Sequence, residues 1–500
     1  NGKAVEMKSI DSGTEFPILS PIQIDLAMWM HRRYLEPLGK TLKLFLPFTA
    51  KKPSELTREV STEMISSRED VSDMKFRYIL GDSTERFALY LKAISENSGQ
   101  SLILFPDQIS LERFEHTFQA SDIQIPLHVI RKRTTKRQRM AMQADVVAGK
   151  PVIVAGTRSA LFVPFADLKL IIMDDEANSS YESYDQHPYY QTWDVARKLQ
   201  QLSSCQFITG GSFPSVRAVR LLERDRVSLP LGFDTHEKIN IHYMINEFRS
   251  GNHKPFSQEL LEQAVTGKQY LIYVNRRGKS SFIQCQECAH TIECPHCQAA
   301  LVEHTFAKPP YPRYLLCHRC ERTYRIPDGC PACGSYELDF RGLGIEKIAG
   351  ELAAYIPGEK IEILDRDRTK KLVDQEHIIH GFKKGKVQAV LATAMIEKFL
   401  HREMMPENFE TIVVNADALF SYPDYEAINH SLRLVQKFVD VSETVHLQTF
   451  FQEPDEQAEM TPFSEQWFLA LFAKDIDERK QFKHPPYSRT IEIVTKHRYK

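Results

Sequence analysis

Short apolar runs alternate with amphipathic segments along most of the chain. The runs at 101–105 (after Ser101), 152–155 and 170–173 are continuously apolar, and residues at helical spacing precede or separate them, near 84–97, 108–119 and 135–148. Continuous apolar runs are typical of strands that are buried on both faces of a parallel sheet. The pattern therefore predicts an α/β domain over 74–237.

A second series begins at 271–274, is interrupted by a cysteine-rich segment, and resumes at 361–364, 387–391 and 411–414. This predicts a second α/β domain with an insertion. The expected boundaries are an N-terminal segment with an amphipathic helix from Pro21 (1–50), a polar linker (51–73), the start of the second domain (238–284), the cysteine-rich module (285–334), the remainder of that domain (335–451) and a further segment (452–500).

Composition limits the possible environments and partners. The formal net charge is −2, so any nucleic-acid surface must be local. No apolar run of about 18 residues predicts a transmembrane helix, and no secretory signal opens the chain. We expect a cytoplasmic protein with no membrane partner. Because the sequence begins at Asn1 and ends at Lys500 in a strand-like stretch, we expect a fragment.

Eight of the nine cysteines form four Cys-x-x-Cys pairs. Each pair on a tight turn can offer two thiolates, and two pairs complete a tetrahedral zinc site, so we expect two Zn²⁺ ions. Disulfides are disfavoured without a secretory signal, and iron–sulfur ligation is a further alternative. Spacing leaves nested and sequential pairing open. The expected ligands are Cys285, Cys288, Cys294, Cys297, Cys317, Cys320, Cys330 and Cys333.

Several motifs together resemble one known family. They are Gly-Thr-Arg-Ser-Ala-Leu-Phe-Val-Pro-Phe (156–165), Tyr-Val-Asn-Arg-Arg-Gly (273–278), Gly-Leu-Gly-Ile-Glu-Lys (342–347), Leu-Asp-Arg-Asp (364–367) and Asp-Ala-Leu-Phe-Ser (417–421). In this order they resemble the primosomal protein N′ (PriA) family of superfamily 2 replication-restart DNA helicases.

The resemblance implies tandem RecA-like helicase domains with an inserted two-zinc ribbon. Residues 1–50 would then end an N-terminal domain that binds a 3′ DNA end, and 452–500 would begin a C-terminal domain. It also implies nested zinc pairing: Cys285, Cys288, Cys330 and Cys333 would hold the outer ion, and Cys294, Cys297, Cys317 and Cys320 the inner one.

The nucleotide site departs from the family pattern. In the P-loop place the chain reads Gly-Asp-Ser-Thr-Glu-Arg-Phe (81–87), with Gly81, Thr84 and Arg86 as the candidate nucleotide contacts. Arg86 stands where the phosphate-binding Lys would be, and Phe87 where a hydroxyl would ligate Mg²⁺. Glu85 replaces a glycine and would repel phosphate.

Three other parts of this site are also altered. Asp174 and Asp175 occupy the Walker B place, followed by Ala177 instead of the family's His. In the second domain, 392–398 has lost a Gly and a Gln, and Asp440 and Glu443 replace two arginines that would stabilise the transferring phosphate. We therefore expect ATP and Mg²⁺ to bind poorly. An active ATPase with substitute residues remains the alternative.

Two segments are candidates for DNA contact. Residues 131–139 hold six basic side chains, and the candidates Arg131, Lys132, Arg133 and Lys136 could follow a phosphate backbone. The segment 179–190 resembles the family's aromatic-rich loop, in which Tyr181 and Tyr184 could stack on bases. The alternatives are a solvated helix start and rings that pack the loop onto the domain.

Three functions follow. The first is a PriA-like replication-restart protein that binds branched or 3′-ended DNA and serves as a loading platform with an impaired motor. By resemblance its partners would be forked DNA or single-strand/duplex junctions, other primosome proteins and single-strand-binding proteins. The alternatives are an active ATP-dependent 3′–5′ DNA helicase and a zinc-dependent protein-interaction scaffold.

Overall fold

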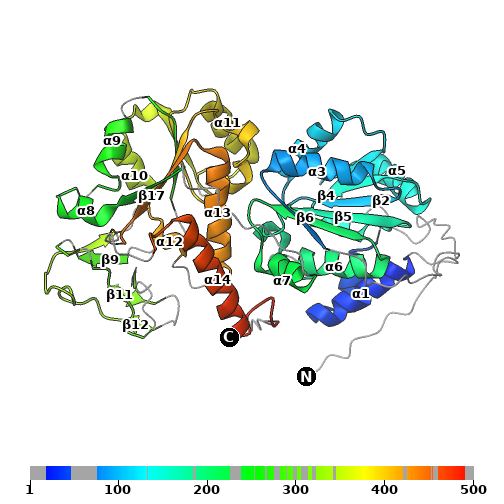
Figure 1. Ribbon diagram of the computed structural model, residues 1–500, viewed down its shortest axis with the longest axis horizontal. Helices are drawn as coiled ribbons and strands as arrows, with labels where there is room; N and C mark the ends of the chain where they lie inside the picture. Colours follow the sequence, from blue (N-terminus) through cyan, green and yellow to red (C-terminus); the bar gives the residue numbers. More distant parts are fainter. Residues whose placement is uncertain are drawn as a thin grey trace, which may run out of the picture. The chain divides into compact units, whose positions relative to one another are not determined.

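The computed structural model describes residues 19–46, 76–131, 133–183, 187–225, 238–252, 254–264, 267–274, 282–285, 287–288, 290–296, 301–305, 313–317, 322–341, 345–366, 368–420, 425–451, 453 and 460–489. The chain divides into two compact units, 1–229 and 230–500 (Figure 1). The predicted linker over 51–73 lies outside the described residues.

The first unit is built on a parallel sheet. Among its described residues six strands pair in the order β1-β6-β5-β2-β4-β3, all in parallel. The strands are β1 (Arg77–Leu80), β2 (Gln100–Leu104), β3 (Leu127–Ile130), β4 (Ile153–Gly156), β5 (Leu168–Asp174) and β6 (Gln206–Gly211). Strand β2 is buried at all five positions, which is why its apolar run does not alternate.

Helices connect and cover these strands. They are α1 (Pro21–Tyr34), α2 (Leu38–Lys43), α3 (Ser83–Ser95), α4 (Gln108–Gln119), α5 (Lys136–Val147), α6 (Thr192–Ser203) and α7 (Val216–Arg224). Helices α3, α4 and α5 confirm the helices expected near 84–97, 108–119 and 135–148.

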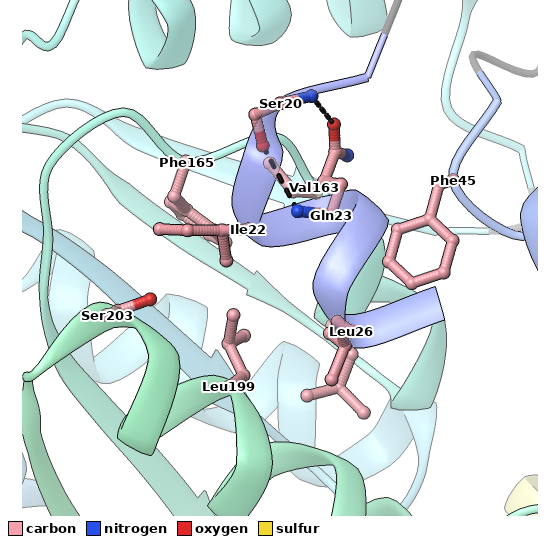
Figure 2. Close-up of a pocket in the computed structure, with 10 residues that line it drawn as sticks. Ser20, Ile22, Gln23, Leu26, Phe45, Val163, Phe165, Leu199 and Ser203 are labelled. Atoms are coloured by element: carbon pink, nitrogen blue, oxygen red, sulfur yellow. Dashed lines mark hydrogen bonds between the residues drawn. The ribbon is translucent and has the colours of Figure 1, made fainter. Parts of the chain in front are cut away.

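The N-terminal helix α1 packs onto this first unit. Ser20 begins it with a capping box in which Gln23 N–H donates to the Ser20 hydroxyl and Ser20 N–H to the Gln23 side chain. Figure 2 shows this end of α1 beside Phe165 and Leu199. Leu26 is buried in the same core cluster as the strands, and α1 contacts α6 (Figure 1).

The second unit also contains a parallel sheet. Its described strands pair in the order β14-β15-β8-β16-β17-β7. They are β7 (Ile239–Tyr243), β8 (Tyr270–Tyr273), β14 (Ile361–Leu364), β15 (Ala389–Ala392), β16 (Glu410–Val413) and β17 (Thr444–Thr449). The helices are α8 (Met244–Arg249), α9 (Gln258–Ala264), α10 (Ile345–Leu352), α11 (Leu372–Lys383), α12 (Asp417–Phe420), α13 (Ala427–Val441) and α14 (Glu465–Gln481).

An antiparallel ribbon is inserted between β8 and α10. Its described strands are β9 (Phe282–Cys285), β10 (Val302–Thr305), β11 (Arg313–Leu316), β12 (Thr323–Tyr324) and β13 (Leu338–Arg341). Because β9 pairs with β13, the ribbon reaches from 282 to 341, beyond the 285–334 expected from the cysteines. The two α/β units and the insertion confirm the predicted fold class.

Candidate functional site

The loop after β1, where a nucleotide phosphate would bind, is occupied by a side chain of the chain itself. Asp82 precedes α3, and its Oδ1 accepts from the backbone N–H groups of Thr84 at 2.7 Å and Glu85 at 3.0 Å. Glu85 Oε2 accepts in return from Asp82 N–H at 3.3 Å, and Gly81 N–H donates to the Gly211 carbonyl. The amides of a helix N-terminus bind anions, and here the anion is the Asp82 carboxylate.

Gly81 is required by this arrangement. Its φ is +146°, and a Cβ at this position would lie 2.5 Å from Oε2 of Glu85. The glycine that survives from the phosphate-loop pattern thus allows Glu85 to fold back over the loop.

Arg86 occupies the place next to Asp174 where a P-loop protein would hold Mg²⁺. Its Nε donates to Asp174 Oδ1 at 2.8 Å and its Nη1 to the Gly81 carbonyl at 2.7 Å. The Tyr90 hydroxyl donates to the same Asp174 oxygen at 3.0 Å. Both charged side chains are buried, with exposed fractions of 4% and 2%. Burial opposes the charge on Arg86, but Asp174 outweighs it and raises the pKa of Arg86 well above its usual value.

The residues after Asp174 face other partners. Asp175 has a left-handed backbone with φ +46°, and Asn178 Nδ2 donates to its Oδ2 at 2.8 Å. Glu176 accepts from both the backbone N–H and the hydroxyl of Ser215 at 2.8 Å. Burial raises the pKa of Glu176 to about 7 despite these two bonds. The residues present therefore do not fit ATP with Mg²⁺ as the family pattern would hold it.

In the second unit, Glu397 of the altered segment 392–398 takes part in an ion pair with a buried arginine. Arg433 Nη2 donates to Glu397 Oε2 at 2.8 Å, and His430 Nε2 lies 3.3 Å from Oε1. Burial would raise the pKa of Glu397, but His430 and Arg433 lower it far below its usual value. Asp440, in an expected arginine position, accepts from the Gln436 side chain at 2.9 Å.

Four cysteines of the ribbon come together as the nested pairing predicts. The sulfurs of Cys285, Cys288, Cys330 and Cys333 all lie within 4.8 Å of one another. The Cys285–Cys333 and Cys288–Cys330 sulfurs are 3.5 and 3.6 Å apart. A tetrahedral zinc with Zn–S bonds of about 2.3 Å places its sulfurs about 3.8 Å apart, so this set fits the ion. This placement favours nested over sequential pairing for Cys285 and Cys288.

The inner set is described only in part. Cys294 and Cys317 are buried in the ribbon core with Ile283, Ile292, Leu301 and Leu315. The Cys294 sulfur lies 3.1 Å from the Tyr324 hydroxyl. Cys297 and Cys320 lie outside the described residues, so the second zinc site stays a prediction.

The basic segment differs from residue to residue. Arg133 and Lys136 are exposed at the start of α5. Arg131 is ion-paired with Glu115, and its Nε lies 3.9 Å from Glu112. Lys132 lies outside the described residues. Arg133 and Lys136 are thus exposed members of this set for which no ion pair is found among the described residues.

Tyr181 is buried, which corrects the expectation of an exposed stacking ring. Its side chain is 3% exposed, and its hydroxyl lies 2.7 Å from the Asp174 carbonyl and 2.9 Å from the Leu104 carbonyl. The alternative, that the ring packs its loop onto the domain, holds for Tyr181. Tyr184 lies outside the described residues.

Two features of the site went unpredicted. The pair Asp82 and Glu85, at the N-cap and in the first turn of α3, is a capping-box pattern that the sequence did display. Tyr90 gave no such signal, because its partner Asp174 lies 84 residues further along the chain.

In the part of the chain that the structure describes, every helix is too short or too polar to cross a membrane.

No family model matches the chain. It is similar to curated proteins named Replication restart protein PriA. That of Chlamydia trachomatis is 28% identical over 426 residues, which is 81% of this chain and 55% of the relative. That of Borreliella burgdorferi is 25% identical over 512 residues, 95% of this chain and 75% of the relative. That of Bacillus subtilis is 30% identical over 292 residues, 57% of this chain and 35% of the relative.

These relatives confirm the resemblance that the motifs predict. The chain spans about half the length of the Chlamydia trachomatis relative, 55%. Among solved structures, the helicase MrfA bound to DNA aligns with 81% of this chain and 49% of its own at 11% identity, with a TM-score of 0.43.

Proposed function

We propose that this chain is a DNA-binding protein of replication restart that recognises branched or 3′-ended DNA without turning over ATP. It would serve as a platform on which other primosome proteins and single-strand-binding protein assemble. The curated relatives, all replication restart proteins, support the biological role.

The closed loop after β1 carries the proposal. For a phosphate to reach the amides of Thr84 and Glu85, the Asp82 carboxylate would have to leave. For Mg²⁺ to reach Asp174, the Arg86 guanidinium would have to leave a buried carboxylate. The first displacement breaks charge-assisted hydrogen bonds, and the second separates two opposite charges. Contacts of these kinds are the strong polar contacts of proteins.

The second unit supports the same conclusion. Phosphoryl transfer in related folds depends on an arginine that stabilises charge on the transferring group. Here Asp440 stands in one of the two arginine positions, and Arg433 is directed at Glu397 and buried. An anionic Asp440 would raise, not lower, the energy of developing negative charge.

DNA binding would rest on local positive charge. Arg133 and Lys136 are exposed at the start of α5, where phosphates can approach them. The zinc ribbon would hold its ion through Cys285, Cys288, Cys330 and Cys333, where the metal supplies structural stability. We expect two Zn²⁺ ions, the second bound by the inner cysteines.

Two measurements on one preparation test the two halves of the proposal, and the first concerns ATP. ATP hydrolysis by the zinc-loaded protein is measured with and without forked DNA, alongside an Arg86→Ala variant. We expect no turnover above the protein-free rate in any sample. Turnover that DNA stimulates and Arg86→Ala abolishes would establish an active helicase instead.

Fork affinity is measured on the same preparation by fluorescence anisotropy across a salt series. We expect tighter binding to forks than to duplex, and a salt slope that falls by about one in Lys136→Glu for one lost phosphate contact. Lys92→Glu, an exposed charge reversal on α3, serves as the matched control and should keep the slope. A protein that binds no fork at low salt would be a protein-interaction scaffold.

A further inference from the structure

The end of helix α1 and the residues just after it contact the first turn of α6 and the segment before it at three points. Arg33 Nη2 lies 2.6 Å from Asp194 Oδ2. The Tyr34 hydroxyl lies 3.4 Å from the Gln191 carbonyl and accepts from Gln191 N–H at 3.3 Å. Glu36 makes the third contact. The short stretch from Arg33 to Glu36 therefore contacts residues that lie more than 150 positions further along the chain.

Glu36 makes two hydrogen bonds to the aromatic-rich segment. Its Oε1 accepts from the backbone N–H of Tyr189 at 3.1 Å and lies 2.8 Å from Nδ1 of His187. The Glu36 side chain is only 7% exposed. Its own carbonyl lies 2.6 Å from Nδ1 of His31, which ties Glu36 to α1. A buried carboxylate that has a fixed backbone and accepts from two donors holds those two donors in one arrangement.

The two residues that Glu36 holds present their rings to solvent as a pair. The ring centroids of His187 and Tyr189 are 4.1 Å apart at an interplanar angle of 44°. The His187 side chain is 50% exposed and Tyr189 is 42% exposed. Tyr181 and Tyr190, in the same segment, are buried. Exposed rings that are held rigidly offer a face for stacking without the entropic cost of ordering a mobile loop.

We propose that Glu36 is a positioning residue that fixes the His187–Tyr189 ring pair as a stacking platform for an unpaired nucleobase. The inference rests on the proposed function, because it assigns one contact for the single-stranded part of the DNA. A base in duplex has both faces covered by its neighbours, so the platform selects unpaired bases.

The test uses a single-stranded oligonucleotide that carries one 2-aminopurine, whose fluorescence is quenched when the base stacks. Affinity and quenching are measured for the full chain and for Tyr189→Leu, Tyr189→Phe, Glu36→Leu and Glu36→Gln. Tyr336→Leu is the matched control, because Tyr336 is an 82% exposed ring on the ribbon.

We expect Tyr189→Leu to weaken binding about tenfold and to reduce quenching, since a stacked base contributes this much. Tyr189→Phe keeps the ring and should resemble wild type. In Glu36→Leu, affinity and quenching should both fall to the level of Tyr189→Leu. The double variant Glu36→Leu/Tyr189→Leu should bind no more weakly than either single variant. Glu36→Gln retains an oxygen that can accept both hydrogen bonds, so this variant should preserve quenching. A folding defect caused by substitution at this position would not preserve it.

The outcomes separate this inference from the proposed function. If forks bind but Glu36→Leu and Tyr189→Leu quench like wild type, the platform is refuted and the DNA-binding function stands. If a Glu36→Leu protein binds tenfold worse without any change in quenching, the effect is structural and the platform is again refuted. If wild type binds no DNA, both proposals fail.

Discussion

The buried pair of Arg86 and Asp174 gives the sharpest quantitative prediction. Arg86→Met keeps an unbranched apolar stem but removes the charge, and leaves the Tyr90 hydroxyl as a side-chain donor to the Asp174 carboxylate. The two side chains are 4% and 2% exposed. Removing one partner of a buried ion pair costs about 3–5 kcal/mol, because an uncompensated charge remains buried. We expect a loss of that size in the free energy of unfolding of the first unit.

The assay isolates that unit. The chain has three tryptophans, and Trp29 and Trp193 lie in the first unit while Trp467 lies in the second. In a Trp467→Phe background, fluorescence during urea unfolding therefore reports the first unit alone. The cycle comprises Arg86→Met, Asp174→Asn and the double variant.

The double variant should lose less than the sum of the two single losses by at least about 1 kcal/mol, because it leaves no charge unpaired. The matched control is the surface pair of Lys150 and Asp145, with side chains 63% and 27% exposed. Lys150→Met should cost less than about 1 kcal/mol. Single losses of that small size at Arg86, or strictly additive ones, would refute the argument that Arg86 closes this site.

Three further predictions use other parts of the chain. Cys288→Ser should bind about one zinc equivalent less than wild type by atomic absorption, as expected for loss of one tetrahedral site. Cys205→Ser, at a buried cysteine outside the ribbon, should bind as much zinc as wild type. Because burial raises the pKa of Glu176 to about 7, stability should fall by up to about 3 kcal/mol as pH rises from 4.5 through 7, and Glu176→Gln should flatten this loss in pH-dependent urea midpoints. Because burial and His446 lower the pKa of His242 to about 4, stability should fall by up to about 3 kcal/mol as pH drops from 6.5 to 4, and a His242→Gln variant that unfolds with the same acid dependence would contradict this.

The sequence predicted the elements because their signals are local. The apolar run at 101–105 became β2, and helical spacing near 108–119 became α4. The outer cysteine set followed from the family resemblance, and the pairing of β9 with β13 explains it physically, because it brings the first and last knuckles together.

Long-range contacts were beyond the sequence. Arg86 and Asp174 are 88 positions apart and meet through the order of strands β1, β6 and β5. Tyr181 looked like an exposed ring because composition does not show the direction in which a ring points. Glu36 is an isolated acidic residue in the sequence, and only the packing of α1 brings it to His187.

The altered positions of the nucleotide site are coupled, and this coupling bears on function. Losing the phosphate-loop glycines and the lysine would leave backbone donors and a buried Asp174 without partners, each at a cost in stability. Instead Asp82 takes the donors and Arg86 takes Asp174. In the second unit Arg433 and Glu397 satisfy each other in the same way. Selection that maintained only nucleotide turnover would not favour these internal pairs, whereas selection for a stable fold would. The outer cysteine set fits the same requirement, because four sulfurs placed to hold one tetrahedral ion are the arrangement of structural zinc sites, which stabilise a fold.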